Sequence, residues 1–239
     1  MHYYYIMFIK KWNTVKKEIS EEIDGMRYIA ESKVFNSVLL ITIIGEFLLP
    51  HILKRVYAGY NSRTMVMSAL GSPQSPVRLI YNIWLIWLGC FLTFSAFVFF
   101  WKTKANFPIL SILLLLSIGI FAVGAGLLSG LFSVNESKDA VTTASKIHGA
   151  GAAIGFMALL FFPLINGILS FKQNETVSGM VNIVSFILAL VCFVCFVMGD
   201  KEKFQNTVLK YEGLWERLTL FCMYIPLIYK SVYNLAFFR

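Results

Sequence analysis

Residues 79–101 read LIYNIWLIWLGCFLTFSAFVFFW, a run of 23 residues without one charged side chain. A helix needs about 20 mostly apolar residues to cross the hydrocarbon core of a membrane. This run is long enough, and its composition fits no surface helix of a soluble domain. It predicts a transmembrane helix and decides the fold class.

Five further runs share this length and apolar composition, at 34–53, 107–132, 147–171, 178–199 and 214–237. The chain of 239 residues is 58% hydrophobic and only 14% charged, whereas soluble domains have about 25% charged residues. We therefore expect an all-α, polytopic membrane bundle of six transmembrane helices, with residues 34–239 forming one domain.

Residues 1–33 precede the first span and mix aromatic with basic side chains. The opening MHYYYIMFI has no basic region before it and no small-residue cleavage site after it, so a secretory signal is not expected. Two interpretations remain open: an amphipathic segment lying in the membrane interface, or a solvated helical tail.

The net charge is +8. In a membrane protein such a balance reflects anionic lipid and the orientation bias of Lys and Arg. The sequence has no zinc-finger spacing and no aromatic pattern for single-stranded nucleic acid, so nucleic acid is not an expected partner. Basic residues are nearly equal in number on the two sides, and we expect a cell-membrane protein with cytoplasmic termini.

Six spans place both termini on one side of the membrane, where the loops 102–106 and 172–179 are short. The opposite loops, 54–78, 133–146 and 200–213, are longer and more polar. We call the surface that they form the loop face. Because binding residues concentrate on such loops, we expect the loop face to bind a membrane lipid, a small amphiphile or a protein partner.

Glu46 lies deep in the first span, within ITIIGEFLLP. A charged side chain at that depth costs about 2.5–3.5 kcal/mol on insertion scales, so Glu46 should be protonated, paired or facing a polar cavity. Pro50 loosens the helix one turn later. Glu46 is either a ligand or proton site or a hydrogen-bonded tie between spans. A transporter coupled through Glu46 is one alternative function, although no internal repeat supports it.

His148 begins the fourth span, after a loop that carries Glu136 and Asp139. One histidine with scattered acids does not predict a metal site, and no cofactor is expected. His148 is a candidate base or hydrogen-bond donor at the membrane boundary, or a structural residue. A second alternative function is an intramembrane hydrolase or transferase, with Ser68 or a water as nucleophile, His148 as base, and Glu136 or Asp139 as orienting acid.

Arg217 follows Glu216 at the start of the sixth span, within YEGLWERLTL. Adjacent residues do not face each other on a helix, so each needs another partner. A guanidinium binds phosphate or carboxylate through two hydrogen bonds, which makes Arg217 a candidate contact for a lipid headgroup. The alternative is an interfacial Arg that snorkels to the membrane surface.

Small residues recur every four positions in two neighbouring spans. Ala122, Gly126 and Gly130 follow this spacing in the third span, and Gly151 and Gly155 follow it in the fourth. Without side-chain bulk, two helix backbones approach closely and gain van der Waals contact in lipid. The spacing predicts that the third and fourth spans form a tight pair.

The stretch GYNSRTMVMSALGSPQSPVRLIYN, residues 59–82, resembles the signature of the DUF998 family of six-span membrane proteins. GLFSVNESKDAVTTASKIHGAGA at 130–152 and GLWERL at 213–218 are similar to two further passages of that family. The resemblance covers residues 35–237. A looser similarity to the FRAG1/DRAM/Sfk1 membrane proteins implies lipid-related or regulatory roles.

The DUF998 resemblance implies a fold rather than an activity, because the family is named for having no established function. It marks these positions: Tyr60, Ser68, Leu70, Gly71, Pro76, Asn82, His148, Gly213 and Arg217. Where the family has Pro and Asp, this chain has Ser133 and Asn135, so Glu136 or Asp139 must replace any role of that Asp. The chemistry of the residues and the DUF998 resemblance together give six candidate ligand-binding residues: Glu46, Tyr60, Ser68, Asn82, His148 and Arg217.

Overall fold

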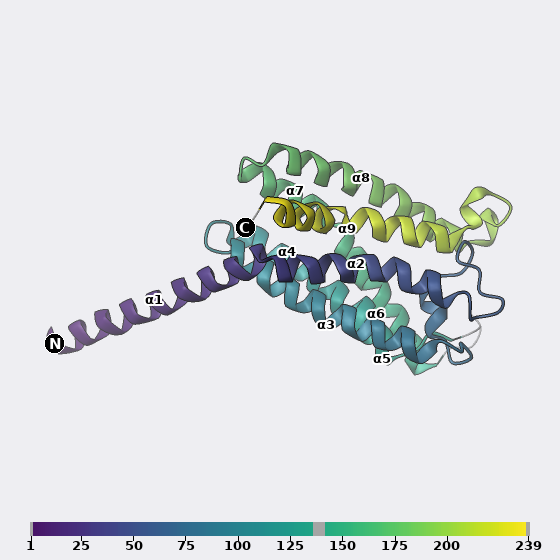
Figure 1. Cartoon of the computed structure of the whole chain (residues 1–239), viewed down its shortest axis with the longest axis horizontal. Coiled ribbons are helices and arrows are strands. Elements are labelled where there is room, and N and C mark those ends of the chain that lie inside the picture. The colour runs from purple at the N-terminus through teal and green to yellow at the C-terminus, as the bar shows by residue number, and fades with distance from the viewer. Residues whose placement is uncertain (1, 136–141, 238–239) are drawn as a thin grey trace.

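The computed structural model of the chain describes residues 2–135 and 142–237, and the described part consists of helices and connecting loops with no strand (Figure 1). Within it, six spans are long and apolar enough to cross a membrane. The predicted all-α polytopic bundle is confirmed. Its spans are α2 (Lys33–Leu53), α3 (Arg78–Thr103), a third from Pro108 to Leu131, a fourth from Thr143 to Lys172, α8 (Thr176–Gly199) and α9 (Glu212–Phe237).

The third span is built from α4 (Pro108–Phe121), the π-helical segment η2 (Ala122–Leu128) and the short α5 (Ser129–Leu131). A π turn holds more residues than an α turn, so it rotates the side chains that follow it. A Cβ at Gly126 would lie 2.6 Å from the Cα of Gly89 in α3, and a Cβ at Gly130 would lie 2.8 Å from the carbonyl oxygen of Asn82. Gly126 and Gly130 therefore face the second span.

The third and fourth spans pack tightly through the predicted Gly151 and Gly155 of the fourth span, but through other residues of the third span than the four-residue spacing predicts. Gly124 of η2 lies against Gly151, where an added Cβ would collide with the Gly151 carbonyl oxygen. A Cβ at Gly155 would lie 3.1 Å from the backbone nitrogen of Ala125. The assignment of Gly126 and Gly130 to this interface is wrong, because the π segment shifts the register of the small residues.

The fourth span consists of α6 (Thr143–Leu160) and α7 (Phe162–Lys172). It begins four residues before the predicted 147 because Thr142 and Ser145 form a capping box. The Thr142 hydroxyl accepts from the Ser145 N–H at 3.2 Å, and the Ser145 hydroxyl accepts from the Thr142 N–H at 3.0 Å. The span is interrupted at Phe161, between α6 and α7. Pro163 lies in the first turn of α7, where a residue without an N–H leaves no helical hydrogen bond unmade.

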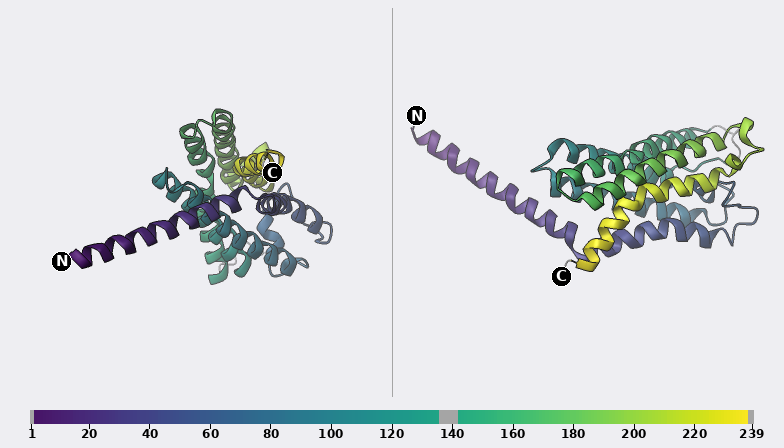
Figure 2. Two further views of the ribbon diagram at one scale, coloured as in Figure 1. Left: turned by 60° about the vertical axis from the view of Figure 1, so that its left-hand side comes forward. Right: turned by 90° about the horizontal axis from the view of Figure 1, so that it is seen from above.

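The N-terminal helix α1 (His2–Glu31) extends away from the bundle, as both views of Figure 2 show. Its last turns pack against α3. Ser32 then separates α1 from α2, with its hydroxyl accepting a hydrogen bond from the Phe35 N–H at 3.2 Å. The choice between an interfacial helix and a solvated tail stays a prediction.

The end of α1 and the end of α9 lie at the same end of the bundle (Figure 1). The opposite end carries the loop face, with the short helices η1 (Met67–Gly71), η3 (Glu202–Phe204) and η4 (Val208–Lys210). Large apolar side chains cover the outside of the spans, for example Val184, Ile187 and Val191 on α8. The chain is a multi-pass membrane protein.

Candidate functional site

A cavity of about 620 Å³ lies inside the bundle on the side of the loop face, and we call it the loop-side cavity. All six spans contribute to its lining, together with residues 66–68 of the first loop. Most of the lining is apolar. Its polar members are Glu46, Ser68, Tyr81, Ser129, His148 and Glu216.

The polar lining residues gather toward the loop face. Glu216 and His148 lie in the first two turns of α9 and α6, counted from that face, and Ser68 belongs to the loop itself. Glu46 lies seven residues before the end of α2, which places it about 10 Å inside that end of the helix at 1.5 Å per residue. Apolar side chains line the part farther from the loop face, among them Leu88, Phe121 and Phe156. The cavity is therefore amphipathic along the membrane normal.

Glu46 is buried and accepts a hydrogen bond from the indole nitrogen of Trp84, with Nε1 and Oε2 separated by 2.7 Å. This bond joins α2 to α3. Pro50 lies four residues later and has no N–H to donate to the Glu46 carbonyl. Glu46 is thus both a tie between two spans and a cavity-lining carboxyl group, so the two interpretations of it are compatible.

Glu216 is the second buried carboxyl group of the cavity and is not among the six site residues predicted from the sequence. Its Oε2 accepts a hydrogen bond from the backbone N–H of Met67 at 2.7 Å, which fixes η1 against α9. The spacing of Gly213, Glu216 and Leu220 on the inner face of α9 was a usable signal, because positions three and four apart share a helix face.

Arg217 holds the first loop in place. Its Nη1 donates to the carbonyl oxygens of Ser62 at 2.8 Å, Met65 at 3.2 Å and Gly213 at 2.6 Å. Its Nη2 donates to the Tyr60 hydroxyl at 2.6 Å. The guanidinium also lies 3.8 Å from Glu216 Oε2, so the two neighbours do interact at the edge of ion-pair range. Arg217 lies beside the loop-side cavity and is absent from its lining.

Tyr60 lies outside the spans and completes this loop anchor. Its hydroxyl donates to the Val66 carbonyl at 3.2 Å and accepts from Arg217. Burial raises the pKa of Tyr60 to about 12, although the positive charge of Arg217 opposes that shift. The neutral phenol is therefore the form that holds the loop at physiological pH.

His148 is buried in the cavity wall, and its Nδ1 lies 2.9 Å from the carbonyl oxygen of Phe132. A carbonyl oxygen only accepts, so Nδ1 carries the hydrogen in this contact and Nε2 of the neutral ring is an acceptor. Ser68 lines the same cavity, and no hydrogen bond joins it to His148 among the described residues. Glu136 and Asp139, the proposed orienting acids, lie outside the described residues.

The cavity extends to the outer surface of the bundle between α6 and α8. Met157 of α6 and Val197 of α8 line it, yet their side chains are 47% and 46% exposed. The two helices have few contacts with each other along their length. Since the outer surface of the spans faces lipid, the cavity opens sideways toward the surrounding lipid.

The chain matches the family model described as Protein of unknown function (DUF998) over residues 43–232. It belongs to the DUF998 family. The membership predicted from the sequence is confirmed, and the looser similarity to FRAG1/DRAM/Sfk1 proteins stays a prediction. No curated protein and no solved structure matches the chain.

Several positions of the DUF998 signature have clear structural roles in the first loop. A Cβ at Gly213 would collide with the carbonyl oxygen of Met65, so glycine lets the loop lie against α9. Likewise, Gly71 leaves room for the Asn82 side chain. Asn82 lies outside the loop-side cavity, and its amide nitrogen approaches the Ser133 hydroxyl at 3.5 Å. These DUF998 positions shape the loop that walls the cavity.

Ser133 and Asn135, where this chain departs from the DUF998 pattern, also have partners. Arg78 Nε donates to the Ser133 hydroxyl at 3.1 Å. The Asn135 amide donates to Ser145 at 2.9 Å and accepts from the Thr142 hydroxyl at 3.1 Å. Asn135 thus supports the start of α6, just before His148. Among the described residues, no cluster of three His, Cys, Asp or Glu side chains could hold a metal ion.

Proposed function

We propose that this DUF998 protein binds a membrane amphiphile in the loop-side cavity, with the apolar chain between the spans and the polar head near the loop face. The observation that carries the proposal is the distribution of the lining. Two carboxyl groups and a histidine lie on the loop side, and aromatic and aliphatic side chains lie toward the membrane centre. Sites for small molecules commonly have volumes of roughly 300–1,000 Å³, and this cavity of about 620 Å³ falls in that range.

The lining favours a head group that donates hydrogen bonds, such as an amine or a hydroxyl. Glu46 and Glu216 present carboxyl oxygens, and His148 presents an acceptor nitrogen when Nδ1 holds the hydrogen. Arg217, which the sequence suggested as a headgroup contact, has its guanidinium engaged by three backbone carbonyls and Tyr60. We therefore propose that Arg217 positions the cavity wall and that the carboxyl groups meet the ligand.

The sideways opening between α6 and α8 supports a ligand that resides in the bilayer. An amphiphile could enter between Met157 and Val197 with its chain already in the apolar phase. The first loop, which walls the cavity, would not have to move. Arg217 and Glu216 attach this loop to α9, whereas the opening lies between α6 and α8. A water-soluble substrate would gain nothing from such an arrangement.

Native mass spectrometry of the protein in mild detergent tests the proposal, comparing wild type with Ala152→Phe. Ala152 lines the cavity, so a phenyl group there fills part of the space that the chain would occupy. We expect wild-type protein to carry a discrete additional mass of an amine- or hydroxyl-bearing amphiphile, and the variant to lose it. The mass would also identify the ligand class.

Ala150→Phe is the matched control, since Ala150 is exposed on the same helix and is not part of the cavity lining. This variant should retain the bound mass. Thermal unfolding of all three proteins checks that the fold is intact. A bare mass for wild type, or full retention in Ala152→Phe, would contradict the proposal and direct attention to a protein partner on the loop face.

A further inference from the structure

A second cavity, of about 520 Å³, lies at the opposite end of the bundle, where the sequence predicted only short turns. We call it the terminal-side cavity. Residues of α1, α3, α4, α7, α8 and α9 line it, with the turn between α7 and α8. Phe99, Leu114, Phe162 and Leu227 form an apolar part, and a group of charged and amide side chains forms the rest.

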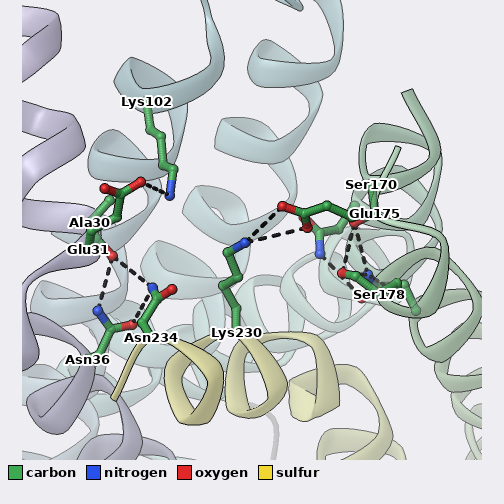
Figure 3. Close-up of polar contacts among 11 residues, drawn as sticks. Ala30, Glu31, Asn36, Lys102, Ser170, Glu175, Ser178, Lys230 and Asn234 are labelled. Atoms are coloured by element: carbon green, nitrogen blue, oxygen red, sulfur yellow. Dashed lines mark hydrogen bonds and ion pairs between the residues drawn. The ribbon is translucent and has the colours of Figure 1, made fainter. Parts of the chain in front are cut away.

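Three cations line this cavity: Arg27, Lys102 and Lys230. Lys102 Nζ lies 3.0 Å from Glu31 Oε1, and Lys230 Nζ lies 3.2 Å from Glu175 Oε1 (Figure 3). These ion pairs hold the two ammonium groups at the cavity wall but use only part of their donor capacity, because each ammonium has three hydrogens. Arg27 is exposed and forms no hydrogen bond or ion pair within the described part of the chain.

Asn234 supplies a buried acceptor without a partner. Its amide nitrogen donates to the Ala30 carbonyl at 3.2 Å and to Asn36 Oδ1 at 3.1 Å, which joins α9 to α1 and α2. Its Oδ1 has no hydrogen-bond partner among the described residues, although the side chain is only 1% exposed. In Figure 3 this oxygen points away from Ala30 and Asn36. Leaving a buried acceptor unsatisfied is costly, so Oδ1 is suited to receive a donor from a ligand.

We propose that the terminal-side cavity binds a phosphate ester whose head also carries a hydroxyl or amino group. Arg27, Lys102 and Lys230 supply the donors for the phosphate, and Asn234 Oδ1 accepts from the head. The lining carries three positive and two negative side chains, so a group of negative charge is favoured. The apolar part fits the first carbons of an acyl chain, which makes a glycerophospholipid one source and a soluble phosphate metabolite the other.

Binding is measured on the full-length protein in detergent by isothermal calorimetry with three probes: dihexanoyl phosphatidylglycerol, glycerol 3-phosphate and inorganic phosphate. Arg27→Gln/Lys230→Gln removes two cations with little effect on the fold, because Arg27 is unpaired and the Lys230–Glu175 pair is partly exposed. Losing two charge-assisted contacts should weaken binding about tenfold or more. Lys33→Gln is the matched control, since Lys33 is an exposed cation at the same end that does not line the cavity.

Binding of the phospholipid alone, weakened in the double variant and unchanged in Lys33→Gln, would support a lipid site. Binding of glycerol 3-phosphate with the same response would support a soluble phosphate ester. Absence of binding for all three probes would overturn the proposal, and so would equal affinity in wild type and the double variant. The variants do not touch the loop-side cavity, so a loss of binding in the double variant reports on the terminal-side cavity alone, even where the phospholipid probe also enters the loop-side cavity.

Discussion

At the residue scale, the neighbouring residues Glu216 and Arg217 both hold the first loop against α9, each through different contacts. Glu216 reaches into the loop-side cavity and fixes the Met67 N–H, whereas Arg217 reaches along the first loop to two of its carbonyl oxygens and a phenol. A guanidinium suits this role because its donors diverge in a plane. The loop that walls the cavity is therefore held by the geometry of Arg217 as well as by its charge.

Arg217→Lys tests this role, because lysine keeps the charge and loses the planar fork. We expect the first loop to loosen by about 1–3 kcal/mol, the cost of leaving buried partners unsatisfied. Hydrogen exchange should accelerate at residues 61–67 and stay unchanged in α8. Arg55→Lys, at an exposed site just after α2, is the control. Unchanged exchange in Arg217→Lys would show that charge alone holds the loop.

Tyr60 gives a prediction in pH. Its folded-state pKa is raised from 10.0 to about 12 by burial, so below pH 10 it adds no pH dependence to stability. Between pH 10 and 12 the folded protein keeps a proton that the unfolded chain has lost, and stability falls as pH rises. The difference in tyrosinate absorbance between wild type and Tyr60→Phe reports the ionisation of Tyr60, and it should therefore titrate near pH 12. A difference signal that titrates near pH 10 would mean that Tyr60 is solvated.

The residues that the sequence could identify were those whose chemistry contrasts with their surroundings. Glu46 and His148 stood out as polar groups at apolar positions, and both line the loop-side cavity. Trp84 and Glu216 were missed for a physical reason. Tryptophan is common in membrane spans, and Glu216 lies among interfacial residues, so only the inward direction of each side chain distinguishes it.

At the scale of elements, the boundaries of the spans followed from the lengths of the apolar runs. The π segment Ala122–Leu128 did not, because AVGAGLL consists of small and aliphatic residues that fit an α-helix equally well. The preference for π geometry comes from the neighbours. It lets Gly126 meet Gly89 of α3 while Gly124 meets Gly151 of α6, and these tertiary contacts are not encoded in the local pattern.

Two glycines of the third span provide a matched comparison of packing. Gly126→Ala places a Cβ 2.6 Å from the Gly89 Cα, where only backbone could give way. We expect a loss of about 1–3 kcal/mol in the free energy of unfolding. Gly119→Ala meets nothing within 4 Å and should be neutral or stabilising by up to about 1 kcal/mol, because alanine favours a helix. Thermal unfolding in detergent measures both, and an equal effect of the two would contradict the close approach of α3.

At the scale of the whole molecule, the loop face and the terminal end each carry a cavity. The lengths of the loops indicated the loop face as a binding surface and gave no sign of a cavity at the terminal end. The terminal-side cavity arises between the sides of helices that are far apart in sequence, and its charged residues come from α1, α3, α9 and a short turn. Such a site depends on how the helices are arranged, which a single sequence does not reveal.

Single cysteines placed at the two ends test the arrangement of the chain in the membrane. Cysteines replacing the exposed Arg55 and Lys201 should react with a membrane-impermeant maleimide from one side, and cysteines replacing Lys172 and Lys33 from the other. The background has the four native cysteines changed to serine or alanine. Labelling of Arg55→Cys and Lys172→Cys from the same side would contradict six spans. The same experiment in intact cells tests the predicted cytoplasmic termini.

The sideways opening of the loop-side cavity changes how its occupancy should be expressed. A molecule that arrives between Met157 and Val197 comes from the two-dimensional phase of the bilayer. Its abundance there is a mole fraction of total lipid, set by partitioning before the protein takes part. Diluting the sample with buffer leaves that mole fraction nearly unchanged, whereas diluting the bilayer with inert lipid lowers it. Occupancy should therefore rise with the ligand-to-lipid ratio and be almost independent of the aqueous volume.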